Sequence, residues 1–454
     1  MYKSNILAIL MILVIVFSYS AGVAGSQPVS SMGGAEGAGS AGATGGAENI
    51  SDADSTDGGT GAASNVPVPE ISAASAILVE AETGQVLYHK NKNARLHISA
   101  ACKLMTVLVA IENSDIYSNA TVSADSVNIE GSALNLQVGA KHQVVDLLYA
   151  IMLTSANDAA IAVAEYVSAG DIEKFTAKMR ETALKLNMNN TNFTNPTGLY
   201  DEKQYTTAAD ISLLIRYAIQ NPTFNRIFSA KARPWYSPET EARILTSSNK
   251  LFWGYDGVEG GKTGYNKKEQ QTIICTANRS NMKLICIVLD APENTMYSDA
   301  VSLLDYGFNN FRKSTLVRKG EHLKTSELDG KEIRLVSQDD IMYVHPLSEN
   351  YIEHFSVEAD LKLPLKRTVP VGNAKYVLQD GTEILVSLYP ETEIVPPDDT
   401  LTKIRKKIIE NKDIFVLVAI LLVIEALLML GNLGKLLRKL VRSVFRRPRN
   451  NSSR

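Results

Sequence analysis

A predicted helix begins with the segment Ser99-Ala100-Ala101-Cys102-Lys103-Leu104-Met105-Thr106, and its apolar residues keep helical spacing as far as Asn113. The same spacing returns in three later segments, 145–169, 172–186 and 207–219. Strand-like runs joined by turn residues predict hairpins before and after these helices, at 76–88 and 271–289. This order of strands, helices and strands predicts an α+β fold, in which an antiparallel sheet carries a helical insert.

The composition is that of a globular chain, with 454 residues of which 45% are hydrophobic and 21% are charged. This length is enough for two or three domains. The three cysteines exclude a disulfide framework and a four-cysteine zinc site. The six histidines have no zinc-ligand spacing, and the sequence has no glycine-rich phosphate loop. We therefore predict neither a metal nor another cofactor.

The N-terminal end has the pattern of an export signal. Lys3 precedes an apolar run at 6–17, and small residues follow at 21–25, so we predict a signal peptide at 1–25. An uncleaved anchor is the alternative. Residues 26–70 are dominated by Gly, Ala, Ser, Asp and Thr and are predicted to form a disordered linker, because they cannot bury enough apolar surface to fold.

The C-terminal end has the pattern of a membrane anchor. Residues Ile414–Leu433 are apolar over the thickness of a bilayer, apart from Glu425 and Asn432, and a basic tail follows them. We predict a transmembrane helix at 413–434, with the body outside the cell membrane and the tail at 435–454 in the cytoplasm. An amphipathic helix on the membrane surface is the alternative.

The distribution of charge agrees with this topology. The formal net charge is −3, but basic residues are concentrated after residue 402, so the rest of the chain is acidic. An acidic body argues against a nucleic-acid partner, whereas a basic tail favours a membrane. Short alternating runs between the last predicted helix and the membrane anchor predict a small β domain. The remaining predicted boundaries are 71–315 for the α+β domain, 316–397 for the β domain and 398–412 for a connector.

Three separated clusters carry the residues that could do chemistry. They are Ser99 to Lys103 at a helix start, Ser155-Ala156-Asn157-Asp158 between helices, and Lys262-Thr263-Gly264 in a strand. Together with the segment Phe193–Leu199, this set resembles the D-alanyl-D-alanine carboxypeptidase family of low-molecular-weight penicillin-binding proteins, which are serine peptidases. The resemblance covers about residues 71–311. It implies a penicillin-binding-protein/β-lactamase-like fold and a peptidoglycan stem peptide ending in D-Ala-D-Ala as the partner.

The resemblance also implies a role for each matching residue. In the family a serine at the helix start attacks the D-Ala-D-Ala carbonyl, and a lysine three residues later accepts its proton. The second cluster relays protons and holds the substrate amide, and the third binds the terminal carboxylate. The matching positions here are, for catalysis, Lys103, Ser155 and Asn157 and, for substrate binding, Lys262, Thr263 and Gly264.

The family's nucleophilic serine has no counterpart in this sequence, because Ala100 stands three residues before Lys103. Two replacements are conceivable. Ser99 is one helical turn before Lys103 but is rotated by about 100° from position 100. Cys102 is next to Lys103 and therefore points elsewhere on the helix. Gln204, Asn266 and the pair Glu269-Gln270 depart from the family pattern too, at positions where it usually has His, Thr and Ala-Gly.

We therefore predict a cell-wall protein of this family that recognises stem peptides but has lost serine hydrolysis. An active carboxypeptidase that uses Ser99 is the first alternative. A membrane-anchored scaffold with an inert cleft is the second. Cys275 and Cys286 should face each other across the second hairpin, and we expect buried thiols there, with a strained disulfide as the alternative.

Overall fold

The computed structural model describes residues 67–97, 99–237, 240–265, 271–347, 351–395 and 400–444. The predicted signal peptide and nearly all of the predicted linker lie outside these residues, as do Asn266, Glu269, Gln270 and the end of the basic tail.

The centre of the fold is a five-stranded antiparallel sheet with strand order β2-β1-β9-β8-β7. Both predicted hairpins are present in it. The strands are β1 (Ser75–Glu80), β2 (Val86–Lys90), β7 (Val258–Tyr265), β8 (Gln271–Arg279) and β9 (Met282–Ala291).

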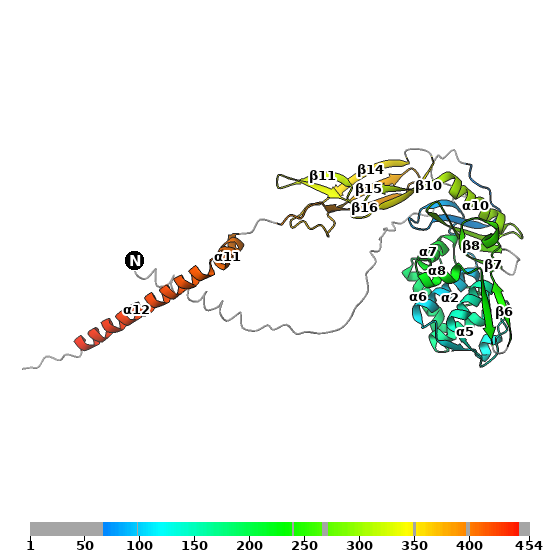
Figure 1. Ribbon diagram of the computed structural model, residues 1–454, viewed down its shortest axis with the longest axis horizontal. Helices are drawn as coiled ribbons and strands as arrows, with labels where there is room; N and C mark the ends of the chain where they lie inside the picture. The colour runs from blue at the N-terminus through cyan, green and yellow to red at the C-terminus, as the bar shows by residue number, and fades with distance from the viewer. Residues whose placement is uncertain are drawn as a thin grey trace, which may run out of the picture. The chain divides into compact units, whose positions relative to one another are not determined.

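Helices cover both faces of this sheet (Figure 1). Every residue of β1 is buried, and its side chains alternate between two cores: Ile77 and Val79 pack with helix α2, whereas Ala76 and Leu78 pack with helix α10. Such alternation with no exposed face is expected of a strand between two layers. The main helices are α2 (Ser99–Asn113), α4 (Val144–Thr154), α5 (Asn157–Ser168), α6 (Ile172–Lys185), α7 (Ala208–Ala218) and α10 (Met296–Asn310).

The stretch of helical spacing at 145–169 is two helices in the structure, with the cluster at Ser155–Asp158 at their junction. The periodic segment 145–169 forms α4 and α5, because Ser155 adopts a left-handed conformation with φ of 60° and ends α4. Shorter elements complete this part of the chain: β3 (Asn119–Thr121), α3 (Ala124–Val127), β4 (Lys141–Gln143), α8 (Pro222–Phe228), β5 (Ala232–Ser237), β6 (Thr240–Thr246) and α9 (Leu251–Gly254).

A β-rich region follows α10, as predicted. Strand β10 (Phe311–Val317) pairs with β13 (Ile341–Pro346). A five-stranded sheet has the order β11-β12-β16-β15-β14 and a core of its own. Its strands are β11 (His322–Leu328), β12 (Lys331–Val336), β14 (Ile352–Ala359), β15 (Gly372–Leu378) and β16 (Glu383–Pro390). The boundaries given above for the domains remain predictions.

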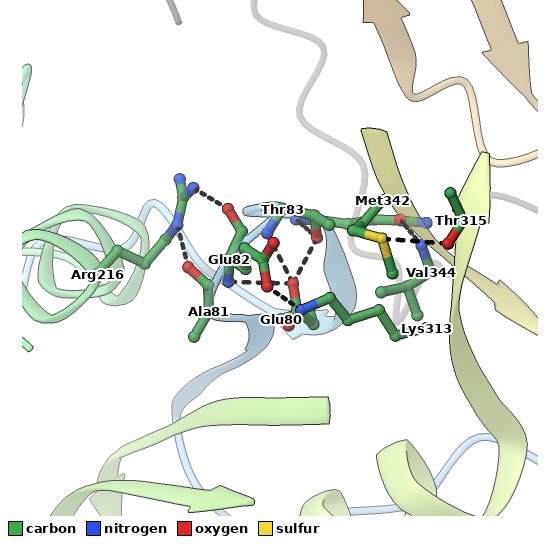
Figure 2. Close-up of polar contacts among 10 residues, drawn as sticks. Glu80, Ala81, Glu82, Thr83, Arg216, Lys313, Thr315, Met342 and Val344 are labelled. Carbon is green, nitrogen blue, oxygen red and sulfur yellow. Dashed lines mark hydrogen bonds and ion pairs between the residues drawn. The ribbon is translucent and has the colours of Figure 1, made fainter. Parts of the chain in front are cut away.

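The turn of the first hairpin, residues 81–85, joins the helical part to the β-rich region (Figure 2). From α7, Arg216 donates hydrogen bonds to the carbonyl oxygens of Ala81 and Glu82, at 3.1 and 3.2 Å. From β10, Lys313 forms ion pairs with Glu80 and Glu82. A Gln85 side-chain oxygen accepts a hydrogen bond from the Val344 amide at 3.0 Å. We call this set of contacts the hairpin joint.

Two helices end the described chain. Most of the predicted connector forms α11 (Thr400–Glu410), and α12 (Lys412–Val444) contains the predicted transmembrane segment. Between Lys412 and Arg442, α12 is long and apolar enough to cross a membrane, and none of its most apolar window is buried against the rest of the chain.

Candidate active site

The first cluster lies at the start of α2, where the helix is buried from Ala100 to Ala110. Ala100 is 1% exposed and Lys103 is 6% exposed. The Lys103 ammonium donates a hydrogen bond to the Thr197 carbonyl oxygen. One turn later, the Thr106 hydroxyl donates to the Pro196 carbonyl oxygen at 2.8 Å. The loop 196–198 therefore fixes the direction of the lysine side chain.

The second cluster lies where α4 ends and α5 begins. The left-handed Ser155 turns the chain, and Asn157 becomes the first residue of α5. The Asn157 amide nitrogens are anchored, because the backbone N–H donates to Ser132 O and Nδ2 donates to Glu130 O, both at 2.7 Å. Its Oδ1 is buried and has no hydrogen-bond partner among the described residues. This oxygen is an acceptor available to a ligand N–H.

The third cluster lies on β7, the edge strand of the central sheet. Lys262 is 1% exposed, and its ammonium donates hydrogen bonds to Ser155 Oγ and, at 3.2 Å, to the Thr263 carbonyl oxygen. The Thr263 hydroxyl lies 2.6 Å from that of Ser248. A Cβ on Gly264 would lie 3.1 Å from Ala100 Cβ. The glycine therefore lets β7 approach the start of α2 closely.

The loop 193–204 closes the site from the other side. Gly198 has φ of 74°, and a Cβ there would lie 2.6 Å from Ser99 Cα, so no other residue fits without a shift. Gln204, which stands where the family usually has a histidine, holds the loop through hydrogen bonds to its backbone. Its Oε1 accepts from the Thr194 backbone N–H at 3.2 Å, and its Nε2 donates to Leu199 O at 3.0 Å.

These three clusters and the loop surround one cavity of about 810 Å³. Of the predicted site residues, Ser99, Lys103, Ser155, Asn157, Thr263 and Gly264 line it, whereas the lining does not include Ala100 and Lys262. The sequence analysis did not assign to the site several residues that also line it: His97, Gly131, Ser132, Thr154, Tyr200, Ser248, Tyr265 and Asp290. Tyr200 and Tyr265 directly follow segments that carried the family resemblance, which was the one signal available for them.

Burial sets the electrostatics of the two lysines. Removal from water lowers the pKa of Lys103 to about 8. Burial, and then the neighbouring charge of Lys103, lowers the pKa of Lys262 to about 7. Near neutral pH both amines can therefore exchange protons, and an anionic ligand would favour their charged forms.

The position of the candidate nucleophiles follows from the helix register. Ala100 packs its methyl group toward Gly264. Ser99 is partly exposed and lines the cavity, but no hydrogen bond between described residues connects its hydroxyl with Lys103, whose ammonium is bonded to Thr197 O. Cys102 is buried, which raises the pKa of its thiol to about 12, so it is a poor nucleophile.

Cys275 and Cys286 are opposite each other in the β8–β9 pair and are free, buried thiols, as expected. Within the ranges that the structure describes, no three His, Cys, Asp or Glu side chains form a group that could hold a metal ion.

The sequence and the fold were both compared with those of known proteins. Residues 62–293 match the family model described as D-alanyl-D-alanine carboxypeptidase. The chain is 28% identical to D-alanyl-D-alanine carboxypeptidase DacF of Bacillus subtilis over 326 residues, covering 69% of this chain and 83% of the relative. It is 27% identical to DacB2 of Mycobacterium tuberculosis, covering 54% of this chain and 86% of that one. The structure of penicillin binding protein 5 from Haemophilus influenzae shares its fold, with a TM-score of 0.65, 24% identity and coverage of 73% and 100%. The chain therefore belongs to the D-alanyl-D-alanine carboxypeptidase family.

Proposed function

We propose that this member of a cell-wall family binds peptidoglycan stem peptides ending in D-Ala-D-Ala without hydrolysing them. The observation that carries the proposal is the side chain at position 100. It lies one residue into α2 and three residues before Lys103, where the family's serine is expected, and it ends in a methyl group. A methyl group cannot attack a carbonyl, so no acyl-enzyme can form through it.

The groups that would hold such a peptide are nevertheless assembled. Asn157 Oδ1 is an acceptor without a partner among the described residues, suited to a peptide N–H. Lys262, joined to Ser155, supplies positive charge next to the cavity for a terminal carboxylate. The cavity volume of about 810 Å³ is in the range of known ligand pockets. Binding without acylation is the function these features support best.

A second candidate is slow hydrolysis through Ser99. It is favoured by one observation, that Ser99 lines the cavity. It is opposed by geometry, because a catalytic constellation tolerates errors of only about 0.5 Å and the Lys103 ammonium is bonded to Thr197 O instead.

Labelling with a fluorescent penicillin separates these candidates. The full chain in detergent micelles should form no covalent adduct, and Ala100→Ser should gain one, because the change adds a single oxygen to an otherwise assembled site. A wild-type adduct that disappears in Ser99→Ala would establish the second candidate and refute ours. Ala100→Gly is the matched control, since it changes the same position without adding a hydroxyl.

Titration of a pentapeptide ending in D-Ala-D-Ala tests binding directly. We expect saturable binding by the wild type and at least a tenfold loss in Lys262→Met, because removing one charge-assisted hydrogen bond costs about 1.5–3 kcal/mol. The same peptide ending in L-Ala-L-Ala is the ligand control. Absence of binding by the wild type would favour a scaffold with an inert cleft.

We also propose that residues 413–434 of α12 span the cell membrane, with the family domain on the outer side and the basic residues of 435–454 in the cytoplasm. The length and apolar composition of α12 and the basic residues at its end support this orientation. Protease added to intact cells should remove the family domain and leave a C-terminal epitope tag intact. Loss of the tag under these conditions would contradict the orientation.

A further inference from the structure

Two polar side chains lie in the apolar part of α12 and have no role in the function described above. α12 is one unbroken helix (Figure 1), and none of its most apolar window is buried against the rest of the described chain. Glu425 and Asn432 are both exposed on it. Polar side chains inside a membrane are costly, and they commonly hydrogen-bond to a neighbouring helix. We therefore asked what could satisfy these two.

The helix itself offers no partner to Glu425. If residues 413–434 span the membrane, Glu425 lies nine residues, or about 13 Å, from the nearer end of the span. The side chains one turn before and after it on its own face are all apolar, since they are those of Leu421, Leu422, Leu428 and Met429. A partner for this carboxyl group must therefore come from a second helix in the membrane.

The two polar residues belong to a heptad pattern. Val418, Glu425 and Asn432 follow one another at intervals of seven, and Leu421 and Leu428 lie between them at alternating steps of three and four. This is the spacing of the a and d positions of a coiled coil, which places all five side chains on one face of the helix. The row is about 21 Å long and fits within the bilayer core of about 30 Å. We call these five residues the seam.

The seam is complementary to that of a second copy of this chain. All copies enter the membrane in the same direction, so two copies pair in parallel and each seam residue meets its counterpart at the same depth. An amide both donates and accepts hydrogen bonds, and so does an uncharged carboxyl group, so Asn432 and Glu425 can each pair with their own copy. Valine at an a position with leucine at d, as at Val418 and Leu421, favours two helices over three or four.

Charge limits the seam at its C-terminal end. The next two positions of the heptad are Lys435 and Lys439, and these like charges would repel each other in a pair of helices. Both lie beyond residue 434, outside the proposed span, where water and salt screen the repulsion. Close packing is therefore confined to the two heptads inside the membrane.

We propose that α12 forms a parallel homodimer in the membrane through the seam. The inference rests on the proposed membrane span, because only the absence of water makes a partner for Glu425 necessary. It does not depend on what the cavity binds. The dimer carries two family domains on the same side of the membrane.

Disulfide crosslinking tests the dimer, with the purified full chain in lipid vesicles at a low protein-to-lipid ratio. Leu421→Cys and Leu428→Cys, each as a single substitution, should form linked dimers on mild oxidation, because a disulfide requires two Cβ atoms within about 4.5 Å. Val423→Cys and Leu430→Cys are the matched controls, since they lie at similar depths on the opposite face of α12. The three native cysteines are buried and should add no crosslink.

Variants of the polar residues test what holds the dimer together. Glu425→Leu and Asn432→Leu should each weaken association about threefold to tenfold, measured by energy transfer between labelled copies as lipid is added. Glu425→Gln should keep most of the association, because an amide also pairs with its own copy, whereas pairing with a basic side chain of another protein would require the carboxylate charge. Val423→Ala, on the opposite face, is the control and should leave association unchanged.

Three results would overturn the inference. They are the absence of crosslinks at the seam positions, equal crosslinking on both faces of α12, and a loss in Glu425→Gln as large as that in Glu425→Leu. Extraction of the same vesicles with alkaline carbonate tests the membrane span separately. A chain that is extracted refutes the span and the dimer together, whereas a chain that stays in the vesicles without seam crosslinks refutes the dimer alone.

Discussion

Replacing Lys313 by methionine should destabilise the fold through the hairpin joint (Figure 2). The Lys313 side chain is 5% exposed and its partner Glu80 is fully buried. Glu80 Oε2 accepts three hydrogen bonds from Glu82 and Thr83, whereas Oε1 has Lys313, at 3.3 Å, and no hydrogen-bond partner among the described residues. Methionine fills a similar volume but leaves Glu80 as an uncompensated buried charge. The expected loss is about 3–5 kcal/mol in free energy of unfolding.

The assay is denaturant unfolding of the full chain in detergent, with the shift in midpoint converted to free energy. Lys362→Met is the control, because Lys362 and its partner Asp360 are 79% and 74% exposed, and an exposed pair contributes at most about 1 kcal/mol. Glu80→Gln combined with Lys313→Met should recover part of the loss, since no charge stays buried. A loss in Lys313→Met no larger than that of the control would refute the argument.

The pH dependence of the same pair provides an independent check. Burial alone would lower the pKa of Lys313, but the hydrogen bond that its ammonium donates to Glu82 and the charges of Glu80 and Glu82 outweigh burial, so this pKa is raised. A raised pKa in the folded state contributes stability that is complete below the unfolded value of 10.5. This stability is lost as the pH rises through the folded value. The wild type should therefore lose its advantage over Lys313→Met above pH 10.5.

Three further predictions concern the site. Gly198→Ala should destabilise the chain by at least about 1 kcal/mol, measured by denaturant unfolding, because the glycine has a positive φ and a new Cβ would press on the backbone of α2. Lys262→Met should raise the free energy of unfolding by about 1–2 kcal/mol near pH 7. A lysine whose pKa is lowered in the folded state reduces stability at pH values below its unfolded pKa of 10.5, so this gain should shrink as the pH rises toward 10. Affinity for a peptide with a free terminal carboxylate should fall between pH 6 and 9, as Lys262 and Lys103 lose charge near their pKa values of about 7 and 8; an amide-terminated peptide should show a weaker dependence in the same titration.

The sequence predicted the parts of the fold whose signals are local. Alternating apolar runs with short turns located both hairpins, and helical spacing located α2, α6 and α7. Helical spacing runs through 145–169 without a break, because a left-handed serine leaves no periodic signal, and only the motif at Ser155–Asp158 indicated a turn between helices there. The hairpin joint was beyond prediction for a different reason. Glu80 and Lys313 look like ordinary surface residues in the sequence, and only the packing of the β-rich region against the hairpin turn buries them.

In the candidate site, too, the sequence predicted what short local motifs indicate and not what depends on distant contacts. Short motifs indicated the residues that line the cavity or lie next to it, but the role of Thr197 depends on where the loop 196–198 folds back onto α2. The two buried lysines bear on the function because each of them destabilises the folded chain. Each ammonium is removed from water, and between described residues neither of them forms an ion pair with a carboxylate. Such groups reduce stability, and an apolar residue of similar size would pack there at lower cost. An inert cleft would gain nothing from two buried ammonium groups, whereas a cleft that binds a carboxylate would use their charge. The two lysines therefore favour a role in recognition over a role as a scaffold.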